Sequence, residues 1–145
     1  MPVANLQLSA RNQIRGSITD VKSGQVMSLV TIRTGDQQFV SAVTNEAVKE
    51  LGLKPNDQVV AVVKASEPIL VKGDEGQVKF SARNKILGHV IGVQKGVAMA
   101  AVTVKSGDFE LTTSITRLAL DELDLNNGDR LTVAFKASAV LLQKA

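Results

Sequence analysis

Three short polar motifs occur twice in this 145-residue sequence and are its best candidates for chemistry. The first copy consists of Ser9-Ala10-Arg11-Asn12, Thr44 and Lys64-Ala65-Ser66. Ser9, Thr44 and Ser66 supply hydroxyl groups, Arg11 and Lys64 supply cations, and all of these groups donate hydrogen bonds. Because no carboxylate lies among them and charge-assisted hydrogen bonds are strong, the set suits a compact tetrahedral oxyanion with two negative charges.

The second copy follows the first at a constant offset of 72 residues, with no gap. It consists of Ser81-Ala82-Arg83-Asn84, Thr116 and Lys136-Ala137-Ser138. Between residues 9–72 and 81–144, more than a third of the aligned positions are identical, where chance would give only a few. The chain is therefore an internal duplication.

Each motif also has a purely structural interpretation, which the residues alone leave open. Arg11 could be a solvated side chain at the entrance of a strand, and Lys64 a solvated lysine at the end of one. Thr44 could simply be the N-cap of a helix. An N-cap role is compatible with anion binding, because the free N–H groups of a helix start favour negative charge.

The elements that must position these motifs can be traced through one repeat. Apolar and β-branched residues at period 2, separated by turn residues, predict five strands, at 12–22, 26–32, 38–43, 58–65 and 68–71. Residues 44–52 predict one short helix that ends at Gly52, and the second repeat predicts its counterpart at 117–124. Three strands, a helix and two strands are the element order of an OB-fold.

We therefore expect an all-β protein of two tandem, OB-fold-like, five-stranded barrels, each with one short helix. The first repeat would span residues 1–72 and the second 73–145, with a glycine-rich, charged linker at about 72–80. A unit of roughly 65 residues buries too little surface to be stable alone. The repeats should thus pack against each other or against other subunits.

Composition excludes several other classes of site. The chain has no cysteine and one histidine, so a thiolate site and a multi-histidine metal centre within one subunit are excluded, and we expect no bare metal cation. The longest apolar runs are far shorter than a membrane span, and no signal peptide is visible. These features predict a cytoplasmic protein that does not enter a membrane.

The repeated octet S-A-R-N-x-I-x-G, the V-T or I-T before a short helix containing E-L-x-L, and the later V-K-A-S or F-K-A-S resemble the molybdenum-pterin-binding (Mop) repeat. This family, also called molbindin, is related to TOBE domains, and the chain resembles its tandem members over nearly its whole length. The resemblance implies a homotrimer that holds molybdate, or tungstate, between subunits and serves molybdenum storage or homeostasis. The ligands it implies here are Ser9, Ala10, Arg11, Thr44, Lys64, Ala65, Ser66, Ser81, Ala82, Arg83, Thr116, Lys136, Ala137 and Ser138.

The chain departs from the family pattern in one respect. Many relatives carry a serine three residues after the helix-capping threonine, and this chain has Ala47 and Ala119 there. One hydroxyl ligand is therefore lost at each site, although the backbone N–H can still donate. The resemblance also implies a second class of site near a threefold axis, which the sequence does not locate.

Three other functions fit the sequence less well than oxyanion binding. OB-folds often bind single-stranded nucleic acid, but such sites stack bases on aromatic residues, and Phe39 and Phe135 lie in apolar strand patterns that predict core positions. We expect no nucleic-acid partner. A regulator or transporter ATPase would need a helix-turn-helix or a phosphate-binding loop, and the sequence shows neither. No nucleophile–base set is visible, and His89 has no repeat counterpart, so we do not expect an enzyme.

Overall fold

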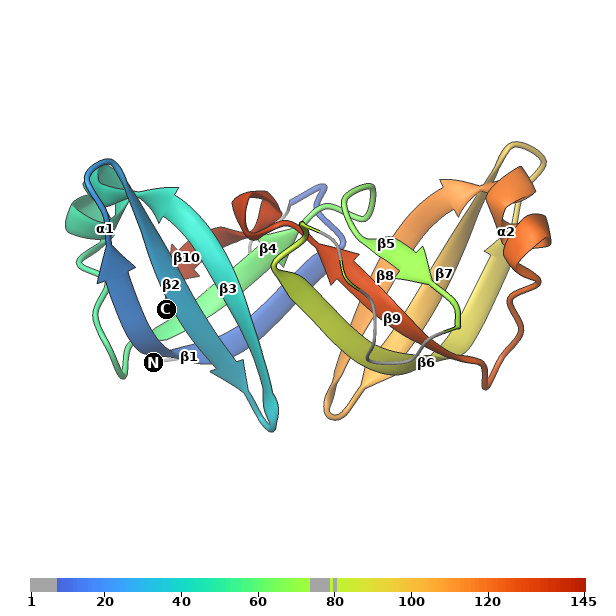
Figure 1. Ribbon diagram of the computed structural model, residues 1–145, viewed down its shortest axis with the longest axis horizontal. Helices are drawn as coiled ribbons and strands as arrows, with labels where there is room; N and C mark the ends of the chain where they lie inside the picture. The colour runs from blue at the N-terminus through green and yellow to red at the C-terminus, as the bar shows by residue number, and fades with distance from the viewer. Residues whose placement is uncertain (1–7, 74–78, 80) are drawn as a thin grey trace.

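The computed structural model describes residues 8–73, 79 and 81–145 and contains two curled, five-stranded sheets that lie side by side (Figure 1). One short helix lies at each outer end of the molecule, α1 on the first barrel and α2 on the second. The elements are β1 (Asn12–Ser23), β2 (Met27–Thr34), β3 (Gln37–Thr44), α1 (Asn45–Leu51), β4 (Gln58–Val63), β5 (Ile69–Val71), β6 (Asn84–Lys95), β7 (Met99–Ser106), β8 (Phe109–Thr116), α2 (Arg117–Leu123), β9 (Arg130–Phe135) and β10 (Leu141–Lys144).

The predicted fold class is confirmed, and the order of elements in each repeat is the expected one. Helix α1 ends where the residues predict, since Gly52 adopts a left-handed conformation (φ 62°) directly after it. In the second repeat Asp124 takes the same conformation (φ 48°), so that α2 ends one residue before the predicted boundary.

The fifth strand of each barrel comes from the other repeat, which the repeat pattern did not predict. β5 of the first repeat pairs antiparallel with β9, and β10 of the second repeat pairs antiparallel with β4. The sheet orders are therefore β10-β4-β1-β2-β3 and β5-β9-β6-β7-β8. Because an exposed edge leaves backbone groups unpaired, the exchange covers one edge of each sheet with a strand from the opposite repeat.

The two barrels share one hydrophobic core. Phe39 of β3 and Phe135 of β9 are each 1% exposed, as their strand patterns predicted, and their ring centroids lie 6.4 Å apart at an angle of 60°. This tilted pair joins the two sheets through direct aromatic contact. Phe109 is also buried, and Phe80 lies outside the described residues.

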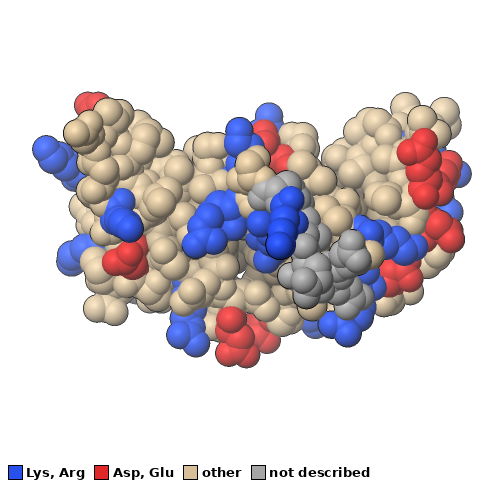
Figure 2. All heavy atoms as spheres, in the orientation of Figure 1, with Lys and Arg blue, Asp and Glu red and all other residues tan. Residues whose placement is uncertain are grey.

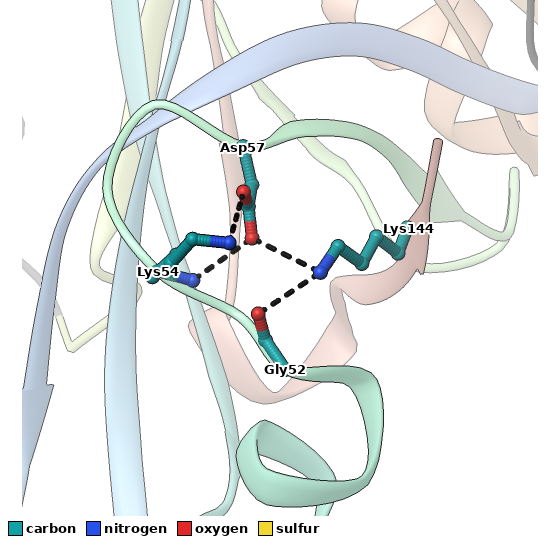
Figure 3. A network of polar contacts seen from close by, with 4 residues as sticks. All are labelled: Gly52, Lys54, Asp57 and Lys144. Carbon is teal, nitrogen blue, oxygen red and sulfur yellow. Dashed lines mark hydrogen bonds and ion pairs between the residues drawn. The ribbon is translucent and has the colours of Figure 1, made fainter. Parts of the chain in front are cut away.

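A lysine at the end of each exchanged strand fastens it to the barrel that it joins. Lys144 Nζ donates to the carbonyl of Gly52, at the end of α1, over 3.0 Å, and lies 3.4 Å from Asp57 Oδ2 (Figure 3). Lys54 completes the network, with its Nζ 3.2 Å from Asp57 Oδ1. A cation at the C-terminal end of a helix is favourable because the last carbonyl groups carry partial negative charge.

Lys72 repeats this arrangement at the end of β5, as the residue equivalent to Lys144. Its Nζ donates to the carbonyls of Leu123 and Asp124 over 2.9 and 2.7 Å and lies 3.3 Å from Asp129 Oδ2. The two lysines therefore form reciprocal latches, each reaching from its own repeat to the helix end and turn of the other.

A buried hydroxyl group without a partner gives a first prediction. Thr132 Oγ1 on β9 has no hydrogen bond within the described structure, and the equivalent residue in the first repeat is Val60. Because an unpaired buried polar group is costly, Thr132→Val should raise the free energy of unfolding by about 1 kcal/mol in urea titrations. The reverse change at the equivalent position of the first repeat, Val60→Thr, should lower the free energy of unfolding by about 1–3 kcal/mol. Equal effects of both changes would contradict this explanation.

The latches predict a specific loss of stability in acid. Burial alone would raise the pKa of Asp57, but hydrogen bonds from Lys54 and Lys144 outweigh it and hold that pKa below 3.8. The pKa of Asp129 is also lowered, chiefly by the backbone N–H of Asn126 and further by Lys72. A lowered folded-state pKa stabilises the fold above the unfolded value and loses that effect as the pH falls through the folded value.

Asp57→Asn and Asp129→Asn should therefore lower the urea midpoint at neutral pH. Their difference from the parent protein should shrink as the pH falls below about 4. A difference that stays constant down to about pH 2 would show that the carboxylate charges do not support the latches.

Candidate functional site

The basic motifs of both repeats lie in the middle of the molecule. β1 begins at Asn12, directly after Arg11, and β4 ends at Val63, directly before Lys64; Asn12 and Val63 are paired across the sheet. Asn84 and Phe135 form the equivalent pair, next to Arg83 and Lys136. The start of β1 and the ends of β4 and β9 all point to the middle, where Lys and Arg side chains gather on the face in view (Figures 1 and 2). In each repeat, the strand pairing thus brings the Ser-Ala-Arg and Lys-Ala-Ser motifs together.

The cations of these motifs are exposed and unpaired. Arg11, Lys64, Arg83 and Lys136 are all exposed, and none of them has a side-chain hydrogen bond or ion pair with another described residue. The four motif serines are exposed as well: Ser9, Ser66, Ser81 and Ser138. Ala10, Ala65 and Ala137 are half-buried, and Ala82 is buried. Each pair of motifs is therefore a group of donors directed at solvent, without a carboxylate that neutralises it.

The Lys-Ala-Ser motifs lie in the segments that carry the chain from one barrel to the other. The Ala65 carbonyl accepts hydrogen bonds from the Ser114 N–H over 2.8 Å and from Thr113 Oγ1 over 3.1 Å, both on β8. In the second repeat the motif forms a short 3₁₀ turn, Ala137–Ala139, followed by Val140, whose carbonyl accepts from Ser41 Oγ over 2.6 Å. Each motif is thus held by the barrel of the opposite repeat.

The predicted threonine ligands are not brought to these motifs within one chain. Thr44 and Thr116 are the N-caps of α1 and α2, and their Oγ1 atoms accept from the N–H groups of Ala47 and Ala119 over 3.1 and 3.0 Å. The structural part of the prediction is therefore confirmed. Both helices lie at the outer ends of the molecule, whereas the basic motifs lie in its middle (Figure 1). A site that includes both needs a second copy of the chain.

The asparagine of each Ser-Ala-Arg-Asn motif has a role that the sequence analysis missed. Asn12 is 3% exposed; its Nδ2 donates to the Thr112 carbonyl over 2.8 Å, and its Oδ1 accepts from the Thr112 N–H over 2.7 Å. Asn84 forms the same pair of bonds with Val40, of 2.9 and 2.7 Å. The repeated asparagines therefore fasten β1 to β8 and β6 to β3, directly beside the arginines. A polar residue at an inward-facing strand position, before Ile14 or Ile86, was the available signal.

Two hollows lie beside Arg11 and Arg83, at equivalent positions of the two repeats. One of about 600 Å³ is bounded by Arg11, Ala65 and the strands β6, β7 and β8. The other, of about 380 Å³, is bounded by Arg83, Asn84 and parts of β2 and β3. In each case the arginine of one repeat faces strands of the other repeat. Space for a small ligand therefore exists beside each basic motif.

Other kinds of site find no support in the part of the chain that the structure describes. It contains no group of three or more His, Asp or Glu residues able to hold a metal ion and no helix that could cross a membrane. His89 is an exposed residue of β6. Phe39, Phe109 and Phe135 are buried, so these rings form no stacking platform for bases.

Comparison with known proteins places these features in a family context. The family model of the TOBE domain matches twice, at residues 8–70 and 81–142. The chain is 35% identical to the molybdenum transport protein ModE of Herbaspirillum seropedicae and 33% identical to the molybdenum-pterin-binding protein MopB of Rhodobacter capsulatus. Each match covers 95% of this chain and 52% of the relative, so the chain spans about half the length of these curated relatives.

A solved structure is similar over nearly its whole length. The cytoplasmic molybdate-binding protein ModG, with molybdate bound, superposes with a TM-score of 0.89 at 34% identity. The similarity covers 94% of this chain and 98% of that one.

The buried asparagines yield a prediction on the integrity of this region. Asn12→Asp and Asn84→Asp keep the volume but replace a donor with an anion that faces a carbonyl. Each should lower the free energy of unfolding by about 2–3 kcal/mol at neutral pH, measured by urea titration. Asn127→Asp, at an exposed position, introduces the same charge and serves as the control. An equal effect at all three positions would indicate a general charge effect.

Proposed function

Because the chain belongs to the TOBE-domain family, as a tandem protein of the molybdenum-pterin-binding type, we propose that it binds molybdate reversibly and acts as a cytoplasmic store or buffer of this oxyanion. Tungstate, which has the same shape and charge, would be accepted at the same sites. The protein captures and releases its ligand without chemical conversion. The molybdenum-related names of its relatives and the molybdate-bound ModG neighbour support the choice of anion.

The observation that carries the proposal is the donor set beside the paired residues Asn12 and Val63. Strand pairing places Arg11 and Lys64 side by side, where β1 begins and β4 ends, exposed and without a carboxylate partner. Cations left unpaired at a repeated position are suited to an anionic ligand, and the neighbouring Ser9 and Ser66 add hydroxyl donors. Rigid donors spaced for molybdate would bind the smaller sulfate poorly, because fewer of them could reach it at once.

The position of the threonines supports binding between copies of the chain. Thr44 lies at the outer end of the molecule and Arg11 in its middle, so one anion can contact both only if a second copy contributes one of them. Apolar side chains are exposed beside the same outer ends: Val26 is 69% exposed, Leu118 67% and Val97 99%. Such residues favour burial against another protein surface. A homotrimer, as the resemblance implies, would bring outer ends and middles together.

Substitution of the two cations tests the proposal. Arg11→Ala and Lys64→Ala should each weaken molybdate binding by roughly 1.5–3 kcal/mol, because each removes a hydrogen bond to a charged ligand. Equilibrium dialysis against molybdate, with sulfate as competitor, measures the change. Lys105→Ala removes an equal charge from an exposed position of β7 outside the motifs and should change affinity little. A parent protein that binds no molybdate, or prefers sulfate, would overturn the proposed function.

A further inference from the structure

The last strand of each sheet, β8 or β3, holds both basic motifs of the opposite repeat. On β8, the N–H and carbonyl of Thr112 are bonded to the side chain of Asn12, in the Ser-Ala-Arg-Asn motif. Two residues further along the same edge, the Ser114 N–H donates to the Ala65 carbonyl of the Lys-Ala-Ser motif over 2.8 Å. Two residues of an extended strand span about 6.6 Å, so the backbone of β8 sets the distance between the points where the two motifs are anchored.

A buried hydroxyl group between Thr112 and Ser114 holds the turn that contains the Lys-Ala-Ser motif. Thr113 is buried, and its Oγ1 donates to the carbonyls of Pro68 and Ala65 over 2.7 and 3.1 Å. Pro68 has no N–H group, so it cannot close the turn by a backbone hydrogen bond to Ala65. The Thr113 hydroxyl replaces that bond, because it bridges the carbonyls at the two ends of the turn.

The first barrel makes the same contact with a different residue. Ser41 of β3 is equivalent to Thr113 and is buried, and its Oγ donates to the Val140 carbonyl over 2.6 Å. Val140 is equivalent to Pro68 but has an N–H group, which closes the turn onto the Ala137 carbonyl over 3.2 Å. In both barrels, therefore, a buried hydroxyl on the last strand of the sheet holds the end of the Lys-Ala-Ser turn of the opposite repeat.

The two barrels share this hydroxyl although the residues beside it differ. Its neighbours are Val40 and Ala42 on β3, and Thr112 and Ser114 on β8. An apolar side chain would suit a buried strand position, because burial of a hydroxyl group is costly unless the group is hydrogen-bonded. Filling the core alone therefore does not explain the shared polar residue, whereas a need to fix the turn does.

We propose that Thr113 and Ser41 are positioning residues that make the oxyanion sites selective for molybdate over sulfate. Each holds the Lys-Ala-Ser turn of the opposite repeat at a fixed distance from the arginine, so that the donors cannot close around a smaller anion. Both hydroxyl groups are buried and directed at carbonyls of the turn, so they act on the donors and not on the ligand. This inference rests on the proposed function and assigns its selectivity to residues outside the motifs.

Removal of each hydroxyl group tests the proposal. Thr113→Val keeps the shape of the side chain, Thr113→Ser keeps the hydroxyl, and Ser41→Ala makes the corresponding change in the first barrel. Ser106→Ala is the matched control, because Ser106 is also buried and its Oγ donates over 2.7 Å to a backbone carbonyl outside the motifs, that of Leu87. Equilibrium dialysis of molybdate, with and without competing sulfate, gives the ratio of the two affinities. Urea titration confirms that each variant is folded.

The expected change is in the ratio of affinities. Thr113→Val and Ser41→Ala should each lower the molybdate-to-sulfate ratio of the sites that they support by about fivefold, the effect of one net hydrogen bond. Thr113→Ser and Ser106→Ala should leave the ratio unchanged, because a loss of stability alone reduces the fraction of folded protein and not the ratio. Equal losses of molybdate and sulfate affinity in Thr113→Val and Ser41→Ala, or no loss, would overturn the positioning role.

A second background shows which sites are affected. Thr113 acts through the motifs of the first repeat, so Thr113→Val should not change the ratio in an Arg11→Ala protein, whereas Ser41→Ala should keep its effect there. An effect of Thr113→Val that persists without Arg11 would overturn the positioning role, because it would arise at sites of another class. In each of these cases the proposed function stands. A parent protein that binds no molybdate would overturn the proposed function itself.

Discussion

The structure depends on the need to pair backbone groups at the edges of two small, open sheets. Neither repeat covers the edge strand of its own barrel, and each supplies a strand to the other instead, β5 to β9 and β10 to β4. Further contacts between the two barrels reinforce this strand exchange. The lysines Lys72 and Lys144 fasten the ends of the exchanged strands, and the Phe39–Phe135 contact fills the space between the sheets. Two units too small to be stable alone thereby become one cooperative structure.

The exchange also determines where the basic motifs lie. Each Lys-Ala-Ser segment follows the last strand contained within its own repeat and precedes the exchanged strand, so it lies at the crossing between the barrels. The Ala65 carbonyl is held by β8, and Asn12 is held by Thr112 on the same strand. Arg11 and Lys64 are therefore positioned by a framework built from both repeats. This framework fixes the backbone positions of the donors, so only their side chains have to be ordered when a ligand binds.

Much of the fold could be predicted from the sequence, and the limits have physical causes. Strand and helix positions followed from residue periodicity, from Thr44 and Thr116 as N-caps and from Gly52 as a helix end. The exchange could not be predicted, because β5 and β10 show the same apolar pattern whichever barrel they join. The convergence of Thr44 with Arg11 stays a prediction, since it involves more than one chain. The hollows beside Arg11 and Arg83 could not be predicted either, because each is formed by the arginine of one repeat and strands of the other.

The covalent connection between the repeats has a kinetic consequence. A free half of this chain would have to find its missing strand on another molecule, and that encounter would depend on protein concentration. The connection from β5 to β6 turns the encounter into an intramolecular one, with an effective concentration that is typically millimolar for short links. The pairing of the two halves is then independent of protein concentration.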